Sequence, residues 1–184
     1  ETVRGGNVIE FTVYGIPKPA GSKRGFAIRN KAGYTGRVGM MDDSGQAGKD
    51  WRGDVKTAAL LAVDEFNDGY PGADAWTPFD GPVRLTIRFY MPRPKGHYGT
   101  GRNAGRMKSS SPKFHTKKPD STKLLRSVED ALTGIVYADD SQVVELVVDK
   151  QYTNIGRPGA AVKVDAVKEK LHGFADPTQG QGTA

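Results

Sequence analysis

Residues 119–142 read Pro-Asp-Ser-Thr-Lys-Leu-Leu-Arg-Ser-Val-Glu-Asp-Ala-Leu-Thr-Gly-Ile-Val-Tyr-Ala-Asp-Asp-Ser-Gln. Apolar residues recur there every three or four positions, which predicts an amphipathic helix over residues 121–133. Asp120 precedes this helix, and the pair Asp139 and Asp140 precedes a β-rich run. If helix and strand pack together, three acids converge. Like charges gather at a cost, so such a cluster predicts a bound divalent cation.

Each of these acids also has a purely structural interpretation. Asp is a favoured N-cap residue, so Asp120 could simply accept hydrogen bonds from the first turn of the helix. The run Asp139-Asp140-Ser141 could be an ordinary turn between helix and strand. Neither position is specific by itself, and the prediction of a metal site depends on their combination.

The flanking pattern predicts a small α+β domain. Period-two alternation predicts strands at residues 8–14, 83–91, 143–152 and 160–167, and helical spacing predicts a second helix at residues 49–67. The expected order is strand, helix, strand, helix, strand, strand. We therefore expect a small mixed sheet of about four strands, packed by two helices.

We expect one domain over residues 8–170, with a long basic loop at residues 93–118 and a disordered tail at residues 171–184. The chain has no cysteine, so disulfides and thiolate metal sites are excluded. It has no apolar run of membrane-spanning length and no signal-peptide pattern. These features predict a cytoplasmic protein with no membrane partner.

Charge is unevenly distributed in this chain of net charge +6. Lys18–Met41 holds six basic residues and no acid, and Arg93–Lys118 holds eight basic residues and no acid. Such segregation is typical of proteins that bind a phosphate backbone, although solvated basic loops would look the same. The candidate DNA-binding residues are Lys18, Lys23, Arg24, Lys95, Lys113, Lys117 and Lys118.

Residues 119–142 resemble the RusA-like Holliday junction resolvases, also called crossover junction endodeoxyribonucleases. The signature of that family runs approximately Asp-x-Asp-Asn/Lys-Leu-x-Lys/Arg, then Asp-Ala-Leu, then Asp-Asp-x-Gln-Val. The matching stretches here are Asp120-Ser121-Thr122-Lys123-Leu124-Leu125-Arg126, Asp130-Ala131-Leu132 and Asp139-Asp140-Ser141-Gln142-Val143.

The resemblance implies a homodimeric, Mg²⁺-dependent endonuclease that nicks four-way DNA junctions symmetrically, in a bacterial or phage-infected cell, with Mn²⁺ able to replace Mg²⁺. By position, Asp120 and Asp140 match essential acids of the family, and Asp139 is the adjacent acid that would help to hold the metal. Arg126 stands where a basic residue assists catalysis. Arg126 or Lys123 would neutralise charge that develops on the phosphate.

The chain departs from the family at Thr122, where a second essential carboxylate is missing. We hypothesise that Glu129 compensates as a metal ligand, because it lies two helical turns on and only about 20° around the axis. Asp130 is the competing candidate, and with Thr122 and Gln142 it is expected to support the site. Alternatively, Glu129 merely pairs with Arg126 on the surface.

Two other functions stay open. The chain could bind branched DNA with little or no cleavage, or it could be a nuclease selective for flaps or forks. An RNA-binding module is the weakest alternative, because no aromatic RNA-binding motif is present. The basic segments are expected to follow phosphates or to wedge into the crossover with interspersed aromatic residues. These residues are Phe26, Tyr34, His97 and Tyr98.

Overall fold

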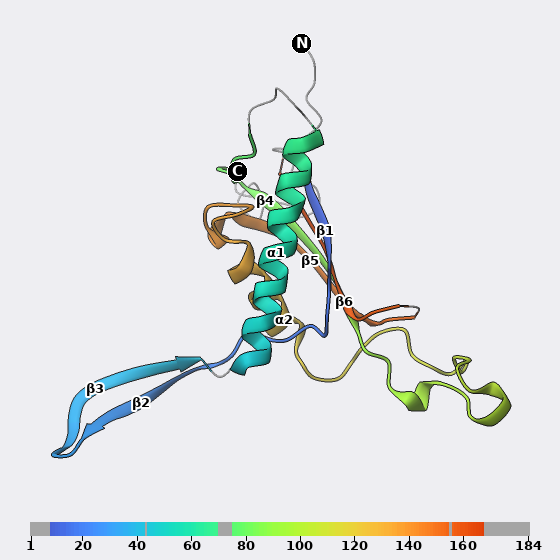
Figure 1. The fold of residues 1–184 in the computed structure, drawn as a ribbon, viewed down its shortest axis with the longest axis horizontal. Helices are drawn as coiled ribbons and strands as arrows, with labels where there is room; N and C mark the ends of the chain where they lie inside the picture. The colour runs from blue at the N-terminus through green and yellow to red at the C-terminus, as the bar shows by residue number, and fades with distance from the viewer. Residues whose placement is uncertain (1–7, 43, 70–74, 155, 168–184) are drawn as a thin grey trace, which may run out of the picture.

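The computed structural model describes residues 8–42, 44–69, 75–154 and 156–167. They form an α+β fold in which a four-stranded mixed sheet packs against two helices, as the sequence predicted (Figure 1). The predicted disordered tail at residues 171–184 lies outside the described residues. No helix in the described ranges is long and apolar enough to cross a membrane.

The helices and strands follow one another in a simple order. They are β1 (Val8–Tyr14), β2 (Lys23–Asn30), β3 (Gly33–Asp42), α1 (Gly45–Gly69), β4 (Val83–Met91), α2 (Ser121–Leu132), β5 (Val143–Tyr152) and β6 (Gly159–Ala166). Short 3-10 turns also occur at η1 (Lys95–His97), η2 (Gly101–Asn103) and η3 (Asp140–Gln142).

The main sheet has the strand order β1-β6-β4-β5, so β1 and β5 are its edges. Strands β4 and β5 are parallel, and the other two pairs are antiparallel. A parallel pair requires a long crossover connection, and the chain between β4 and β5, which includes α2, provides it. Consequently α2 runs back along the sheet before η3 leads into β5.

The core lies between one face of the sheet and the two helices (Figure 1). Alternate residues of β4 are buried on that face, namely Val83, Leu85, Ile87, Phe89 and Met91. The opposite face of β4 carries two arginines. Arg84 is paired there with Glu145, and Arg88 Nε lies 2.7 Å from an oxygen of Asp149. The helices thus cover a single face, which is why only that face of β4 is uniformly apolar.

The hairpin of β2 and β3 was not predicted from the sequence, which indicated only a basic segment over Lys18–Met41. The two strands pair with each other and form a separate two-stranded sheet. They project away from the body of the molecule (Figure 1). Because the hairpin packs on no core, its sequence lacks the buried apolar stripe by which strands are recognised.

The long basic loop at residues 93–118 is held in place by hydrogen bonds. The Arg93 guanidinium donates to the carbonyl oxygens of Thr153 and Pro112 at 3.1 and 2.9 Å. It also donates to the side-chain oxygen of Asn154 at 2.7 Å. The loop therefore has a defined path, which leaves the body on the side opposite the β2–β3 hairpin (Figure 1).

Candidate active site

Asp120 occupies the N-cap position of α2, but its side chain makes no capping hydrogen bond. Only its backbone carbonyl takes part in the helix, accepting from the Leu124 amide at 3.1 Å. The residue is exposed. The Asp120 carboxylate therefore does not cap the helix, contrary to the structural interpretation of this residue. It is free of the helix backbone and accessible to a ligand.

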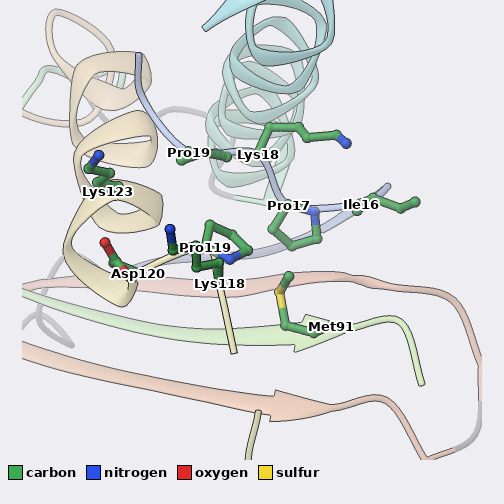
Figure 2. Close-up of a pocket in the computed structure, with 9 residues that line it drawn as sticks. All are labelled: Ile16, Pro17, Lys18, Pro19, Met91, Lys118, Pro119, Asp120 and Lys123. Atoms are coloured by element: carbon green, nitrogen blue, oxygen red, sulfur yellow. The ribbon is translucent and has the colours of Figure 1, made fainter. Parts of the chain in front are cut away.

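A cavity of about 470 Å³ lies beside Asp120, at the start of α2 (Figure 2). It is bounded by the segment after β1, the end of β4 and the approach to α2, and we call it the lysine pocket. Its lining residues are Ile16, Pro17, Lys18, Pro19, Met91, Lys118, Pro119, Asp120 and Lys123. The pocket combines three lysines, Lys18, Lys118 and Lys123, with apolar side chains. The lysines can bind the phosphate of a nucleotide, and the apolar side chains can contact its sugar or base.

Lys150 on β5 supports this pocket and was missed from the sequence. Its ammonium group donates to the carbonyl oxygens of Lys117 at 2.8 Å and Pro119 at 2.6 Å. Burial lowers the pKa of Lys150, and the negative charge of Asp120 opposes that shift. Lys150 pairs in register with the buried Phe89, so it occupies a core-facing position of β5. A lysine at a core-facing position of the strand pattern is unusual, and that is the signal that could have identified it.

A second set of acids lies at the other end of α2 and consists of Glu129, Asp130 and Asp140. Burial raises the pKa of Glu129, and the charges of Asp140 and Asp130 raise it further, while Arg126 opposes them. Like-charge repulsion of this kind is relieved by a proton or by a bound cation. The carboxylates of this acidic set are hard oxygen donors of the kind that a divalent cation prefers, but among the described residues they form no complete metal site within one chain.

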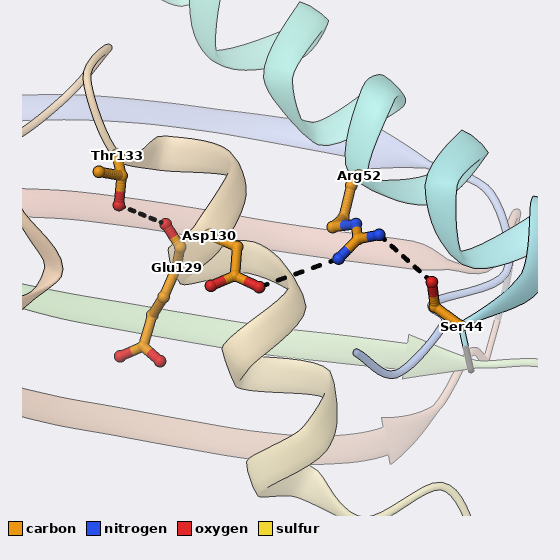
Figure 3. Close-up of polar contacts among 5 residues, drawn as sticks. All are labelled: Ser44, Arg52, Glu129, Asp130 and Thr133. Atoms are coloured by element: carbon orange, nitrogen blue, oxygen red, sulfur yellow. Dashed lines mark hydrogen bonds and ion pairs between the residues drawn. The ribbon is translucent and has the colours of Figure 1, made fainter. Parts of the chain in front are cut away.

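The two candidates for the missing carboxylate differ in their partners. Asp130 lies 3.9 Å from the guanidinium of Arg52 on α1, which in turn donates to the Ser44 hydroxyl at 3.2 Å. Figure 3 shows the Glu129 carboxylate pointing away from this pair. Within the described ranges, no ion pair joins Glu129 to Arg126. Glu129 is thus the better placed candidate for a metal ligand.

Asp139 and Gln142 shape the turn that carries Asp140. Asp139 accepts the Ser141 amide at 2.9 Å, and hydrogen bonding from the side chain and then the backbone of Ser141 lowers the pKa of the Asp139 carboxyl. The Gln142 side chain accepts the Asp139 amide at 2.9 Å and donates to the carbonyl oxygen of Phe79 at 2.8 Å. These bonds anchor η3 to the chain before β4, so both residues position Asp140.

The lysine pocket and the acidic set are far apart in one chain. Met91, at the end of β4, lines the pocket. Asp140 lies only three residues before Val143, which pairs with Val83 at the start of β4. Eight residues of extended strand span about 26 Å. Within the described ranges, no three His, Asp or Glu residues could together hold a metal ion.

The expectation that Asp120 and the Asp139-Asp140 pair meet within one chain is therefore wrong. The physical reason is direction: α2 runs antiparallel to β5, so its start lies at the far end of the strand from Asp140. The roles assigned to the individual residues stay predictions. Thr122, Lys123 and Arg126 are exposed on α2. Lys123 lines the lysine pocket, and Arg126 lies between the pocket and the acidic set.

The basic residues are divided among three places. Lys18 and Lys118 line the pocket and Lys117 adjoins it, Lys95 and Lys113 belong to the basic loop, and Lys23 and Arg24 lie in β2. Because the segment after β1 and the chain after β4 both begin at the lysine pocket, both basic segments leave the body at the end where Asp120 lies.

Glu129→Gln is expected to raise the melting temperature of the metal-free protein at pH 7. The folded-state pKa of Glu129 is raised, so its ionised form costs stability above that pKa. Below the ordinary pKa of a glutamate the residue is protonated in both states, and the difference should vanish. Thermal melts in EDTA at pH 7 and pH 4 measure this, with Glu10→Gln on β1 as the control. An unchanged melting temperature at pH 7 contradicts the repulsion.

Comparison with known proteins places these features in context. The family model described as endodeoxyribonuclease RusA matches residues 45–165. The uncharacterized protein YqaN of Bacillus subtilis strain 168 is 35% identical over 148 residues, which cover 79% of this chain and 88% of that protein. The family match contains Asp120 and the whole acidic set, whereas the β2–β3 hairpin lies outside it.

Proposed function

This chain belongs to the RusA endodeoxyribonuclease family, and we propose that it is a Mg²⁺-dependent endonuclease that resolves four-way DNA junctions by paired symmetric nicks. The observation that carries the proposal is the uncapped carboxylate of Asp120 beside the lysine pocket. A phosphate held by the lysines would lie next to a carboxylate that the helix does not use.

We further propose that the site is completed across a homodimer. A two-fold axis perpendicular to α2 sets the start of one helix beside the end of its partner. Asp120 of one subunit would then meet Glu129 and Asp140 of the partner subunit, and each dimer would hold two equivalent sites. A four-way junction also has two equivalent strands related by a two-fold, which suits paired nicks.

The exposed edge of β5 supports this arrangement. Its first half carries the exposed apolar residues Val144, Leu146 and Val147. Its last residues are covered by the basic loop, through the bridge between Phe114 and Gln151. An exposed apolar edge strand is a ready partner for another strand. Antiparallel pairing of two β5 strands centred near Leu146 would bring Asp140 toward Asp120 of the partner subunit.

The donor set fits Mg²⁺, because the carboxylates of Glu129 and Asp140 are hard oxygen ligands that repel each other without a cation. Asp120 of the partner subunit would complete the set. These residues would hold Mg²⁺, which would supply an acidified water and neutralise phosphate charge. The lysine pocket would hold the strand, and Lys123 and Arg126 would stabilise charge that develops on the phosphate.

A branched-DNA-binding protein with weak or no cleavage is the second candidate. Thr122 in place of a carboxylate and the separation of the acids within one chain favour it. In that case the lysine pocket and the basic segments would still bind a junction, but no cation would bridge the acids.

The deciding experiment is a titration of an end-labelled four-way junction with the full chain, in Mg²⁺ and in EDTA. The proposed function predicts binding in both conditions and two symmetric nicks only in Mg²⁺. Junction binding without nicks at any divalent-cation concentration contradicts the nuclease proposal and supports the binding protein. Equal cleavage of flaps and forks would contradict the proposed selectivity.

A further inference from the structure

The β2–β3 hairpin is the largest feature that the proposed site leaves unused. It forms its own two-stranded sheet and stands clear of the body (Figure 1). It also lies outside the residues that match the family model, so the family match says nothing about its role. A projection of this size with no structural role in the core requires another explanation.

Apolar and aromatic side chains are exposed along both strands of the hairpin. The exposed fractions are 50% for Phe26, 60% for Tyr34, 62% for Val38 and 64% for Met40. Isolated two-stranded hairpins are marginally stable in water, and contiguous exposed apolar surface marks sites of interaction. The hairpin therefore presents a surface that gains stability when something covers it.

The hairpin is shaped by its own contacts. The Phe26 ring lies across Gly39, where an added Cβ would come within 2.5 Å of the ring. At the tip, the Ala32 amide donates to the Asn30 side chain at 2.9 Å. The Thr35 hydroxyl donates to the carbonyl oxygen of Ile28 at 2.8 Å. These contacts hold the ribbon in shape before it meets a partner.

Charge identifies the kind of partner. Residues 23–41 contain five basic residues and no acid, which favours a polyanion over a second copy of this positively charged chain. Tyr34 pairs across the strands with Arg29, so an aromatic ring and a cation share one face of the ribbon. A regular duplex offers phosphates but hides its base faces. A branch point offers both, because stacking is interrupted there.

We propose that the β2–β3 hairpin inserts at the branch point of DNA, where Tyr34 and Met40 contact unstacked bases and Arg29 and Arg37 contact the adjoining phosphates. The substrate named here rests on the proposed function, but insertion needs no cleavage. The chain before the hairpin is tied to α2 by the Ala20 amide, which donates to the carbonyl oxygen of Lys123 at 2.8 Å. The β2–β3 hairpin is therefore attached to the body of the molecule beside the lysine pocket.

The test compares dissociation constants for a four-way junction and for a linear duplex of the same arm sequence, both in EDTA. The double variant Tyr34→Ala/Met40→Ala is expected to lose about tenfold in junction affinity, while its duplex affinity stays within about twofold. Arg29→Gln/Arg37→Gln should weaken both complexes. Tyr14→Ala, which removes an equally exposed aromatic residue from β1, is the control and should change neither.

The insertion proposal is overturned if Tyr34→Ala/Met40→Ala weakens junction binding and duplex binding equally, or weakens neither. Light scattering of the same variant tests the rival occupant, because conversion of a dimer to a monomer would assign the hairpin to a second copy and overturn the proposal. If the wild-type protein prefers the junction but does not nick it in Mg²⁺, the proposed nuclease function is contradicted. The insertion proposal would still be supported in that case by the expected loss of junction affinity in Tyr34→Ala/Met40→Ala.

Discussion

Asp120→Asn is expected to reduce junction nicking in Mg²⁺ by about 10³-fold, because the proposed site would lose a metal-binding carboxylate and with it several kcal/mol of transition-state stabilisation. Junction affinity should be unchanged or slightly tighter, since the substitution removes a negative charge from beside three lysines. Stability should change by less than about 0.5 kcal/mol, because the Asp120 side chain caps nothing and Asn is an equally good N-cap residue. Single-turnover nicking, junction binding in EDTA and a thermal melt measure the three effects.

The matched control is Asp64→Asn, which removes an exposed carboxylate from α1 and should leave nicking unchanged. If Asp120→Asn nicks at the wild-type rate, the carboxylate is not part of the site. If it instead unfolds the protein, the residue has a structural role that its missing capping bond does not indicate.

Much of the fold follows from local pattern. Strand β4 alternates buried and polar residues because only one of its faces meets the helices, and the predicted bounds of β1, β4 and β5 are confirmed. Helix α2 was predicted over residues 121–133 and spans Ser121–Leu132, since its apolar stripe packs on the sheet. These elements were predictable because burial imposes the period of the secondary structure on the sequence.

The site was predictable as a set of residues but not as an arrangement. The sequence identifies Asp120, Glu129 and Asp140, but it does not say that α2 runs antiparallel to β5, which puts Asp120 beside Lys150 and Glu129 beside Asp140. The role of Gln142 in anchoring η3 depends on a tertiary contact, its hydrogen bond to the carbonyl oxygen of Phe79.

Because the acids are separated within one chain, the proposed homodimer is central to the proposed mechanism. If Asp120 acts together with Asp140 of the partner subunit, each site draws one residue from each chain. A heterodimer of Asp120→Asn and Asp140→Asn chains then has one site with both carboxylates missing and one site that is intact. Sites built within single chains would instead each carry one defect.

The most direct measurement is the nicking rate of that heterodimer, made by co-expression with two different affinity tags. We predict about half the wild-type rate with a single nick per bound junction, while both parent homodimers are inactive. The reciprocal control pairs wild type with the Asp120→Asn/Asp140→Asn double variant, and it should be inactive. Val147→Lys, placed on the exposed edge of β5, should abolish the restored activity by separating the subunits. An inactive heterodimer together with an active reciprocal control would contradict a site shared between two subunits.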